Sequence, residues 1–228
     1  MKLSSDTINL LKNFASINQG IYFKQGKTIK TVSPQKNIMA EVTVDENFPV
    51  DFGVYDLNNF LSVISLHKDD PTLNFEDKNI LISGLKGRSK IKYRFTPANM
   101  IVTPPEKQLT MPDAEIKFEL KSEDFDWIMR AANVLSSPQI AIESDGKKVN
   151  IVTLDLSNDS AHTDALEIAE GTGNKYKMIF KTENITKIMS GSYDVSISSK
   201  GISHFKNKTL PLQYWVTTEA GSKFEKGA

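Results

Sequence analysis

The residue types that could carry catalytic or metal chemistry are few in this sequence and poorly spaced for it. The histidines, His67, His162 and His204, lie far apart with no partner at ligand spacing. A lone histidine is more often a surface or satisfied polar residue than a metal ligand. Asp69 and Asp70 could form half of a carboxylate site, but a solvated turn before a proline is the simpler interpretation. These residues therefore predict no catalytic or metal site.

Two glycine-containing segments superficially look like phosphate-binding loops. Residues 83–90, SGLKGRSK, lack the Gly-x-x-x-x-Gly-Lys-Ser/Thr spacing of a P-loop. Residues 171–174, GTGN, do not open a helix after a strand, so a turn is predicted there rather than a dinucleotide site. The chain has no cysteine, which excludes disulfides, thiolate zinc sites and cysteine nucleophiles. The sequence thus predicts a protein that is not an enzyme and needs no cofactor.

Composition sets wide bounds on fold and partners. The 228 residues can form one large β-rich domain or two of ordinary size. Lysine and arginine total 28, as do aspartate and glutamate, so no net charge draws the chain toward nucleic acid or an anionic membrane. No run approaches a membrane span, and the N-terminus lacks a secretory pattern. We therefore expect a cytoplasmic protein with no membrane partner.

The secondary-structure pattern repeats once along the chain. Apolar residues at helical spacing predict a first helix capped by Ser4 or Ser5, and short helices and strand runs follow. The predicted N-caps of the other three helices are Asp56, Ser122 and Thr182. The first four strand runs indicate a meander, and the last seven residues indicate a loose tail. The order of helix, strands, short helix and strands occurs twice, which favours duplicated α+β domains over one sandwich.

A proline-rich stretch separates the two repeats. Helix and strand signals lapse together over residues 97–113, where Pro97, Pro104, Pro105 and Pro112 each fix φ and remove a backbone donor. We expect an N-terminal domain over residues 1–96, a connector over 97–113 and a C-terminal domain over 114–228. These prolines would keep the connector extended, and the apolar residues exposed among them would suit it to docking.

The polar faces of the four predicted helices admit two interpretations. They carry Lys12, Arg130 and Lys187 among asparagine, serine and threonine, while the acids gather in the first helical turns, where the helix dipole favours them. Four ordinary solvated faces are one interpretation. The other is a lining that tolerates phosphates and binds duplex of any sequence weakly, because sparse cations contact the backbone without reading bases.

Two strands with opposite charge patterns suggest an assembly contact. Residues 89–95, SKIKYRF, alternate basic and apolar side chains, whereas 164–170, DALEIAE, alternate acidic and apolar ones, with Asp164, Leu166, Ile168 and Glu170 on one face. Edges of this kind would select each other and discourage self-pairing. A contact between unlike edges must close into a ring or run on as a filament. Alternatively, both strands are internal to their own sheets.

Several stretches together resemble a known family. They are MKLSSDTINLLKNFASINQGI, VDFGVYDLNNFLSVISL, GRSKIKY before the connector, EIKFELKSEDFDWIMRAANVL and IAIESDGKKVNIV. In order, and over nearly the whole chain, they resemble the DNA polymerase sliding clamps, or processivity factors, of T-even-type bacteriophages. The resemblance implies a homotrimer of two-domain chains that closes into a ring around double-stranded DNA, opened by a separate ATP-driven clamp loader. A β-rich phage structural protein of the tail or capsid, with no DNA-tethering role, is the alternative.

The resemblance also implies roles for particular residues. Side chains facing the DNA would be Lys2, Lys12, Lys121, Arg130 and Lys187. Ile91 and Tyr93 would pack across the subunit contact against Leu166 and Ile168 of a neighbouring chain. The connector, through Ile101, Leu109 and Met111, would help to form an apolar pocket for short aromatic-bearing tails, such as the C-terminal tail of the DNA polymerase.

Overall fold

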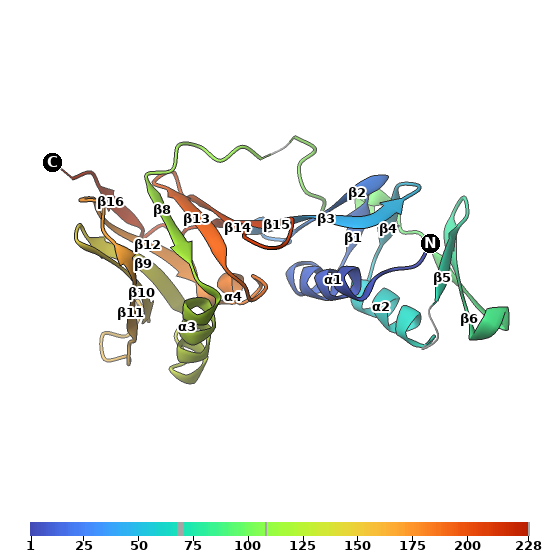
Figure 1. Ribbon diagram of the computed structural model, residues 1–228, viewed down its shortest axis with the longest axis horizontal. Coiled ribbons are helices and arrows are strands. Elements are labelled where there is room, and N and C mark those ends of the chain that lie inside the picture. Colours follow the sequence, from blue (N-terminus) through green and yellow to red (C-terminus); the bar gives the residue numbers. More distant parts are fainter. Residues whose placement is uncertain (68–70, 108, 228) are drawn as a thin grey trace. The chain divides into compact units, whose positions relative to one another are not determined.

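The chain forms two compact units, Met1–Lys107 and Gln108–Ala228. The computed structural model describes residues 1–67, 71–107 and 109–227 (Figure 1). Asp69 and Asp70, considered above as half of a carboxylate site, lie outside the described residues. The boundary between the units falls within the expected connector, whose limits at 97 and 113 stay a prediction.

The first unit packs two helices against short antiparallel sheets. Strand β1 pairs with β4, β2 pairs with β3, and β5, β6 and β7 form a three-stranded sheet in that order. The elements are α1 (Ser5–Ile17), β1 (Ile21–Phe23), β2 (Gly26–Val32), β3 (Ile38–Phe48), β4 (Phe52–Val54), α2 (Leu57–Ser65), β5 (Thr72–Phe75), β6 (Asn79–Gly84), the 3₁₀ turn η1 (Leu85–Gly87), β7 (Ser89–Arg94) and the 3₁₀ turn η2 (Ala98–Met100).

The second unit packs its helices against two longer antiparallel arrays. Strands run β8-β13-β14-β15 in one array and β11-β10-β9-β12-β16 in the other. The elements are β8 (Ile116–Leu120), α3 (Ser122–Val134), β9 (Gln139–Asp145), β10 (Lys148–Leu154), β11 (Ala165–Glu170), β12 (Lys175–Lys181), α4 (Thr182–Ile185), β13 (Tyr193–Ser198), β14 (Ile202–Asn207), β15 (Leu212–Thr217) and β16 (Lys223–Glu225). The predicted α+β class and the two helices in each half are confirmed.

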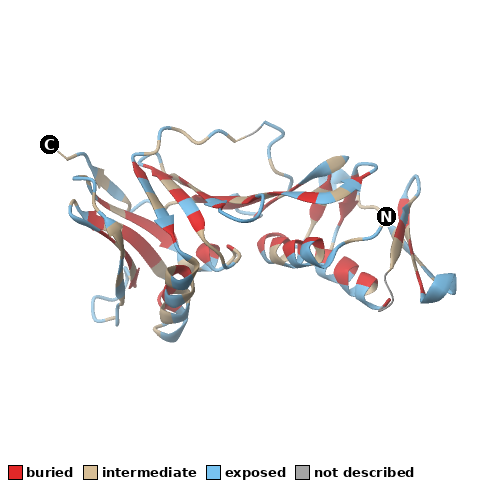
Figure 2. Ribbon diagram, viewed as in Figure 1, coloured by how far each residue is buried: buried red, intermediate tan, exposed pale blue. Residues whose placement is uncertain are grey.

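Each helix buries the apolar face that its residue spacing predicts. In α1 the buried side chains include Leu10, Leu11, Phe14 and Ile17, and in α2 they lie at the same helical spacing (Figure 2). The first unit's core centres on Phe52, whose ring stacks on Phe23 at 4.4 Å between centroids. Burial of these apolar faces, rather than helix propensity, holds such short helices in place.

Two of the four predicted helix caps are wrong. Ser4 and Asp56 cap α1 and α2 as expected, accepting from the backbone N–H of Thr7 at 3.2 Å and of Asn59 at 2.9 Å. Ser122 is instead the first residue of α3, and its own N–H donates to the hydroxyl of a serine from another segment, at 3.1 Å.

Thr182 likewise begins α4 rather than capping it. The N-cap position is Lys181, and the Thr182 hydroxyl instead donates to the carbonyl oxygen of Ser137 at 2.7 Å, which ties the start of α4 to the end of the preceding loop. Helix α4 also ends at Ile185, which leaves Lys187 beyond the helix rather than on its polar face.

Two further strand predictions are corrected. Strands β1 to β4 do not form a meander, because β1 pairs with β4 across the chain while β2 pairs with β3. Gly26 begins β2 at φ 118°, a backbone conformation that other residues rarely adopt, and it allows the chain to change direction between β1 and β2. The last residues are not a loose tail either, since β16 pairs with β12 and Phe224 stacks on Tyr176 at 6.4 Å between centroids.

The start of the connector lies against β4 through a glycine. Thr96 N–H donates to the carbonyl oxygen of Gly53 at 2.9 Å, and a Cβ added at Gly53 would stand 2.2 Å from the oxygen of Thr96 and 2.8 Å from the Cδ1 of Ile101. The oxygen of Thr96 belongs to the backbone and cannot move aside as the end of a flexible side chain could. This position therefore tolerates only glycine.

Gly53→Ala is therefore expected to lower the free energy of unfolding by about 3 kcal/mol, the usual upper range for overpacking. Urea denaturation followed by circular dichroism measures the shift in midpoint. Gly221→Ala is the matched control, because its Cβ would meet only the Cδ1 of Ile179 at 3.4 Å, an ordinary contact. Equal midpoints for the two variants would refute the tight approach at Gly53.

Candidate functional sites

The outward faces of the helices carry few charges. On α1 the exposed residues include Lys12 and Ser16, and on α2 they are neutral: Asn58, Asn59, Ser62 and Ser65. The serine hydroxyls of α2 bond within the helix, with Ser62 donating to the carbonyl oxygen of Asn58 at 2.8 Å. Such faces can approach a phosphate backbone without like-charge repulsion, yet offer little to hold it tightly.

The residues expected to face DNA are distributed over both units. Lys2, Lys12, Lys121 and Arg130 are exposed, and Lys187 is half-buried. Lys121 occupies the N-cap position of α3, and Arg130 lies on the outward face of the same helix. Their role toward DNA stays a prediction.

The first unit leaves one edge of its three-stranded sheet open. On the β5 side the N-terminus adds to the sheet: the Met1 ammonium donates to the Leu73 carbonyl oxygen, and Leu73 N–H donates to the Met1 carbonyl oxygen, both at 2.7 Å. On the other side, among the residues that the structure describes, β7 pairs with β6 alone, and its exposed side chains are Lys90, Lys92 and Arg94.

The second unit repeats this arrangement at the opposite end of its chain. Strand β16 covers β12, while β11 pairs with no described strand other than β10 and so forms the other edge of that array. Glu167 and Glu170 on β11 are exposed. The alternative that both charged strands are internal to their sheets is therefore wrong: each is an edge, and the two edges carry opposite charge.

The pattern of the acidic strand differs from the predicted alternation. The register between β10 and β11 shifts between Val149 and Asn150, so that Ala169 and Glu167 face consecutive residues of β10 and Ile168 is the extra one. Leu166 and Ile168 remain half-buried, but Glu170 is exposed and no longer shares their face. A one-residue bulge leaves no clear signal in the sequence, because it changes pairing without changing composition.

Two interface candidates already contact their own unit. Tyr93 packs edge-on against Phe60 at 5.0 Å between centroids, and its hydroxyl donates to the carbonyl oxygen of Asp56 at 3.3 Å. Burial raises the pKa of the Tyr93 phenol, so it stays protonated and able to donate. Tyr93 thus joins the edge strand β7 to helix α2, while Ile91 lies opposite Ile82 of β6.

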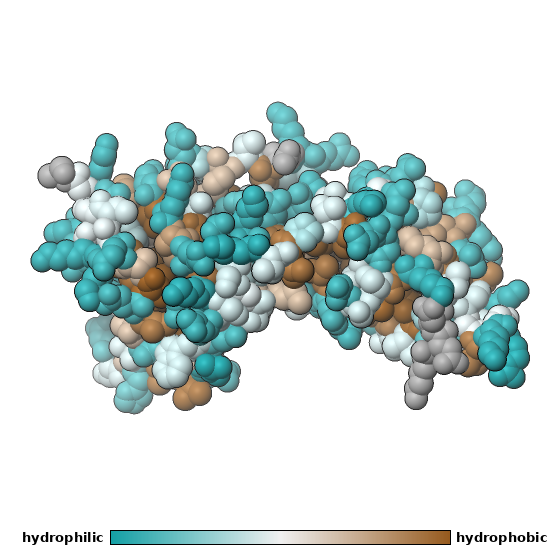
Figure 3. Space-filling view, viewed as in Figure 1, coloured by the Kyte–Doolittle hydropathy of each residue, from teal (hydrophilic) through white to brown (hydrophobic). Residues whose placement is uncertain are grey.

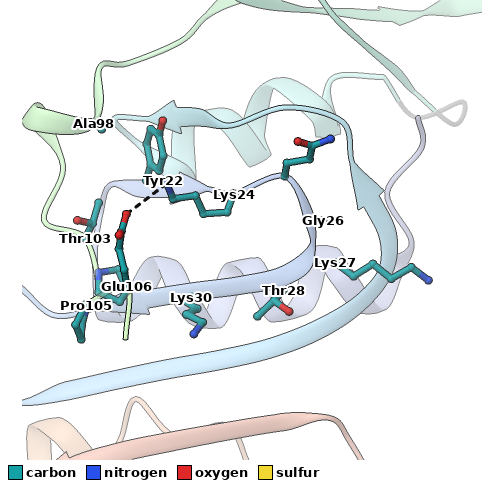
Figure 4. A pocket seen from close by; sticks show the side chains of 12 residues that line it. Tyr22, Lys24, Gly26, Lys27, Thr28, Lys30, Ala98, Thr103, Pro105 and Glu106 are labelled. Carbon is teal, nitrogen blue, oxygen red and sulfur yellow. Dashed lines mark ion pairs between the residues drawn. The ribbon is translucent and has the colours of Figure 1, made fainter. Parts of the chain in front are cut away.

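A pocket in the first unit was not predicted from the sequence. It has a volume of about 480 Å³ and lies between the first half of the connector and strands β1 and β2 with the turn that joins them (Figure 4). Its walls combine an aromatic ring, prolines and lysines; the lining includes Tyr22, Lys24, Lys27, Lys30, Ala98, Thr103, Pro104, Pro105 and Glu106. The prolines were recognised in the sequence, but their partners on β1 and β2 depend on the tertiary fold.

Charge in this pocket is arranged around Lys24. Its ammonium lies 3.2 Å from Asp51 and 3.9 Å from Glu106 of the connector, and 5.3 Å from the centroid of the Tyr22 ring. The hydrogen bond to Asp51 raises the pKa of Lys24, and the N–H of Gln25 lowers the pKa of Asp51. Both groups are therefore ionised at neutral pH, and Lys24 links Asp51 to Glu106 of the connector, so that its positive charge is balanced by these carboxylates.

The three residues predicted for a partner pocket lie in different surroundings. Ile101 is only 9% exposed and fills the space above Gly20 and Gly53. Leu109 and Met111 belong to the second unit and are half-exposed. Their part in binding a partner stays a prediction.

The second unit also carries an exposed tryptophan with polar partners, an arrangement that the sequence did not reveal. Trp127 of α3 is 51% exposed, and its Nε1 donates to the Oδ2 of Asp164 at 3.0 Å. The guanidinium carbon of Arg130 lies 6.0 Å from the Trp127 ring centroid. Helical spacing predicted the Arg130 face, but the link to Asp164 depends on how α3 lies over β11.

The described ranges hold neither a metal-binding cluster nor a membrane-spanning helix. Within residues 1–67, 71–107 and 109–227, no group of three or more histidine, aspartate or glutamate residues could hold a metal ion. None of the helices in the same ranges is long and apolar enough to cross a membrane. On the face shown in Figure 3, hydrophilic side chains predominate. The features that remain as candidate sites are the edges, the helix faces and the pocket.

Solved structures with the same fold define the class of protein. The chain aligns with the PCNA of A. fulgidus, solved with the C-terminal region of FEN-1 bound, at a TM-score of 0.68 and 16% identity over 95% of this chain and 96% of that one. The PCNA of Thermococcus kodakaraensis aligns at a TM-score of 0.66 and 13% identity over 94% and 96%. At these identities the likeness shows the fold alone: two DNA-clamp domains.

Sequence comparison then gives the family. Residues 4–102 match the model for DNA polymerase processivity factors, and residues 117–220 match the model for the C-terminal domain of the gp45 sliding clamp. The sliding clamp of Vibrio phage KVP40 is 33% identical over 96% of this chain and all of that protein, and that of Escherichia phage RB69 is 34% identical over 97% and 98%. The chain belongs to the sliding clamps, the processivity factors of DNA polymerase, and the alternative of a phage structural protein is not supported.

Proposed function

We propose that three copies of this chain close into a ring around duplex DNA, and that the ring holds a phage polymerase by the polymerase's C-terminal tail. The observation that carries the proposal is the pair of open edges, basic on β7 and acidic on β11, in a chain whose other edges in those sheets are covered by its own termini. Unlike edges can join only head to tail, and a head-to-tail contact that closes gives a ring.

A ring explains why weak DNA contacts suffice. A closed ring cannot leave the duplex sideways, so affinity for phosphates can stay low and sliding fast. The tethered polymerase then remains at high local concentration near the primer end. A neutral chain with sparse cations on its helices suits this role. The ring itself carries out no chemical reaction, so a separate ATP-driven loader would open it, in the cytoplasm of the bacterial host.

Loader-dependent stimulation of the cognate polymerase on primed circular DNA tests this function. The ring should lengthen products only when the loader and ATP are present. On a linear template with unblocked ends the stimulation should be lost, since a ring slides off. Equal stimulation on both templates would contradict topological tethering.

The DNA-facing role of the helices gives a separate expectation. Lys12→Ala combined with Arg130→Ala removes two exposed cations, so processivity should fall severalfold at moderate salt, and its salt dependence should weaken by about one unit of slope per lost phosphate contact. Primer extension over a series of salt concentrations measures both quantities. The control is Lys200→Ala combined with Lys206→Ala, which removes the same amount of charge from exposed positions outside the helices: Lys206 lies on β14, and Lys200 lies just before it. Identical losses in both double variants would mean that net charge, not position, is responsible.

The pocket beside the connector is the proposed seat of the polymerase tail. Tyr22, Pro104 and Pro105 supply apolar walls for an aromatic side chain, and the exposed Lys27 supplies positive charge at the rim. Prolines keep this wall extended before the peptide arrives, which reduces the ordering cost of binding. Leu109 and Met111 would extend the surface beyond the pocket.

A further inference from the structure

Trp127 is an unusual residue to find on the surface of a helix. Half of its surface is exposed to solvent although it is the largest apolar side chain of α3, whose Phe125, Ile128 and Ala132 are buried. A large exposed aromatic ring is informative because interfaces are enriched in tryptophan, which supplies much contact area at low conformational cost.

The Trp127 ring is held toward the open edge of the second unit. Its Nε1 donates to the carboxylate of Asp164, which directly precedes β11. Asp164 is fixed in turn, since its N–H donates to the Thr153 hydroxyl at 2.8 Å and its carbonyl oxygen accepts from the Thr153 N–H at 2.9 Å. Trp127 is thus pre-positioned beside the edge rather than free to turn away from it.

The partner's side of the contact follows from the edge strands. Every strand pair described in both units is antiparallel, and antiparallel pairing of β7 with β11 that sets Tyr93 opposite Leu166 keeps apolar residues on one face. The same register sets Lys92 opposite Glu167, so the charges also agree. A register shifted by one residue would instead set Tyr93 opposite Glu167 or Ala165, whose side chains lie on the other face of β11.

This register brings two helices onto the same face of the joined sheet. Tyr93 packs against Phe60 of α2 and bonds to the carbonyl oxygen of Asp56, so α2 covers the apolar face of β7. Trp127 bonds to the start of β11, so α3 lies over the corresponding face of that strand. With the edges paired, α3 of one copy and α2 of the next flank the seam.

We infer that Trp127 anchors each seam of the ring, by packing against helix α2 and Tyr93 of a second copy of the chain. The inference rests on the proposed ring and names a residue of helix α3, rather than of the edge strands, as its main apolar anchor. Because Arg130 lies over the Trp127 ring on the outward face of α3, closing the seam would also fix a side chain expected to face DNA.

The experiment measures association and environment separately. The association constant of the wild type, Trp127→Ala and Trp127→Phe is measured by sedimentation over a concentration series, and tryptophan emission is recorded at each concentration. The other tryptophan, Trp215, is 5% exposed and stacks on His204 at 4.9 Å, so its emission should stay constant. We expect emission to shift to shorter wavelength as chains associate, and Trp127→Ala to weaken association roughly 30-fold or more at each seam.

The controls separate the possible failures. Val134→Ala changes another exposed apolar residue of α3, 80% exposed, and should leave association unchanged. Trp127→Phe should fall between the wild type and Trp127→Ala, since it keeps a ring but loses the bond to Asp164. If the wild type forms three-chain particles and Trp127→Ala does so equally well, the anchor is refuted while the ring stands. An emission change that appears only on DNA loading would assign Trp127 to DNA contact instead, and a wild type that stays a single chain would refute the ring itself.

Discussion

Replacing Lys90, Lys92 and Arg94 together with glutamate should convert the ring into single chains. All three side chains are exposed on β7, so the change leaves the unit's core intact. At the seam it would turn the directly opposed pair of Lys92 and Glu167 from attractive to repulsive. At about 0.5 kcal/mol for the attraction lost and again for the repulsion gained, each seam weakens by about 1 kcal/mol, so that three seams together weaken by about 3 kcal/mol, or roughly 100-fold. Light scattering at micromolar concentration would measure the mass, and processivity should be lost with the ring.

Charge reversal on the other edge is the control for this result. Glu167→Lys with Glu170→Lys should also dissociate the ring, and a chain carrying both sets of changes should reassemble, because each basic edge again meets an acidic one. The pair between Lys148 and Glu167 is lost in these variants, but both side chains are about half exposed, so its contribution to stability is small. A combined variant no more associated than its parents would show that these edges do not meet.

Removing the aromatic wall of the pocket should uncouple the polymerase from an intact ring. Tyr22→Ala deletes the only aromatic ring among the described residues that line the pocket, and aromatic anchors in binding pockets commonly contribute 2 kcal/mol or more, or about 30-fold in affinity. We expect tail-peptide binding, measured by fluorescence polarisation, to weaken by that factor while the mass of the ring is unchanged. Polymerase stimulation should fall in parallel at limiting polymerase.

A comparison with the second half of the connector locates the binding surface. Leu109→Ser with Met111→Ser should weaken the same peptide by a smaller factor, since both side chains are only half-exposed and lie outside the pocket. If the serine variant abolishes binding and Tyr22→Ala does not alter it, the tail is held by the connector alone. Loss of the ring in either variant would instead give these residues a structural role.

The features that the sequence predicted well are those determined by local spacing. Leu10, Leu11, Phe14 and Ile17 mark one face of α1 because a helix brings residues three and four apart together. The alternation on β7 was equally readable, since successive side chains of a strand point to opposite faces. Charge on those exposed faces suggested that the strands were edges, which the sheet order confirms.

The features that the sequence did not predict depend on groups far apart in the chain. The N–H of Ser122, the first residue of α3, donates to the hydroxyl of Ser192, and the hydroxyl of Thr182 donates to the carbonyl oxygen of Ser137. Both partners are distant in the sequence, so local capping rules did not predict how these helices begin. Pairing of β16 with β12 and of β1 with β4 is likewise long-range. The pocket and the link between Trp127 and Asp164 belong to the same class, because each joins segments that only the tertiary fold brings together.

The mass of the unmodified protein in solution tests the central claim most directly. Sedimentation equilibrium at micromolar concentration, without DNA or loader, should give a particle of three chains, each of 25.5 kDa. The opposite charges of the edge strands β7 and β11 motivate this proposed closed assembly. A mass that stays at one chain across the micromolar range, or that grows without limit as a filament would, would contradict the account.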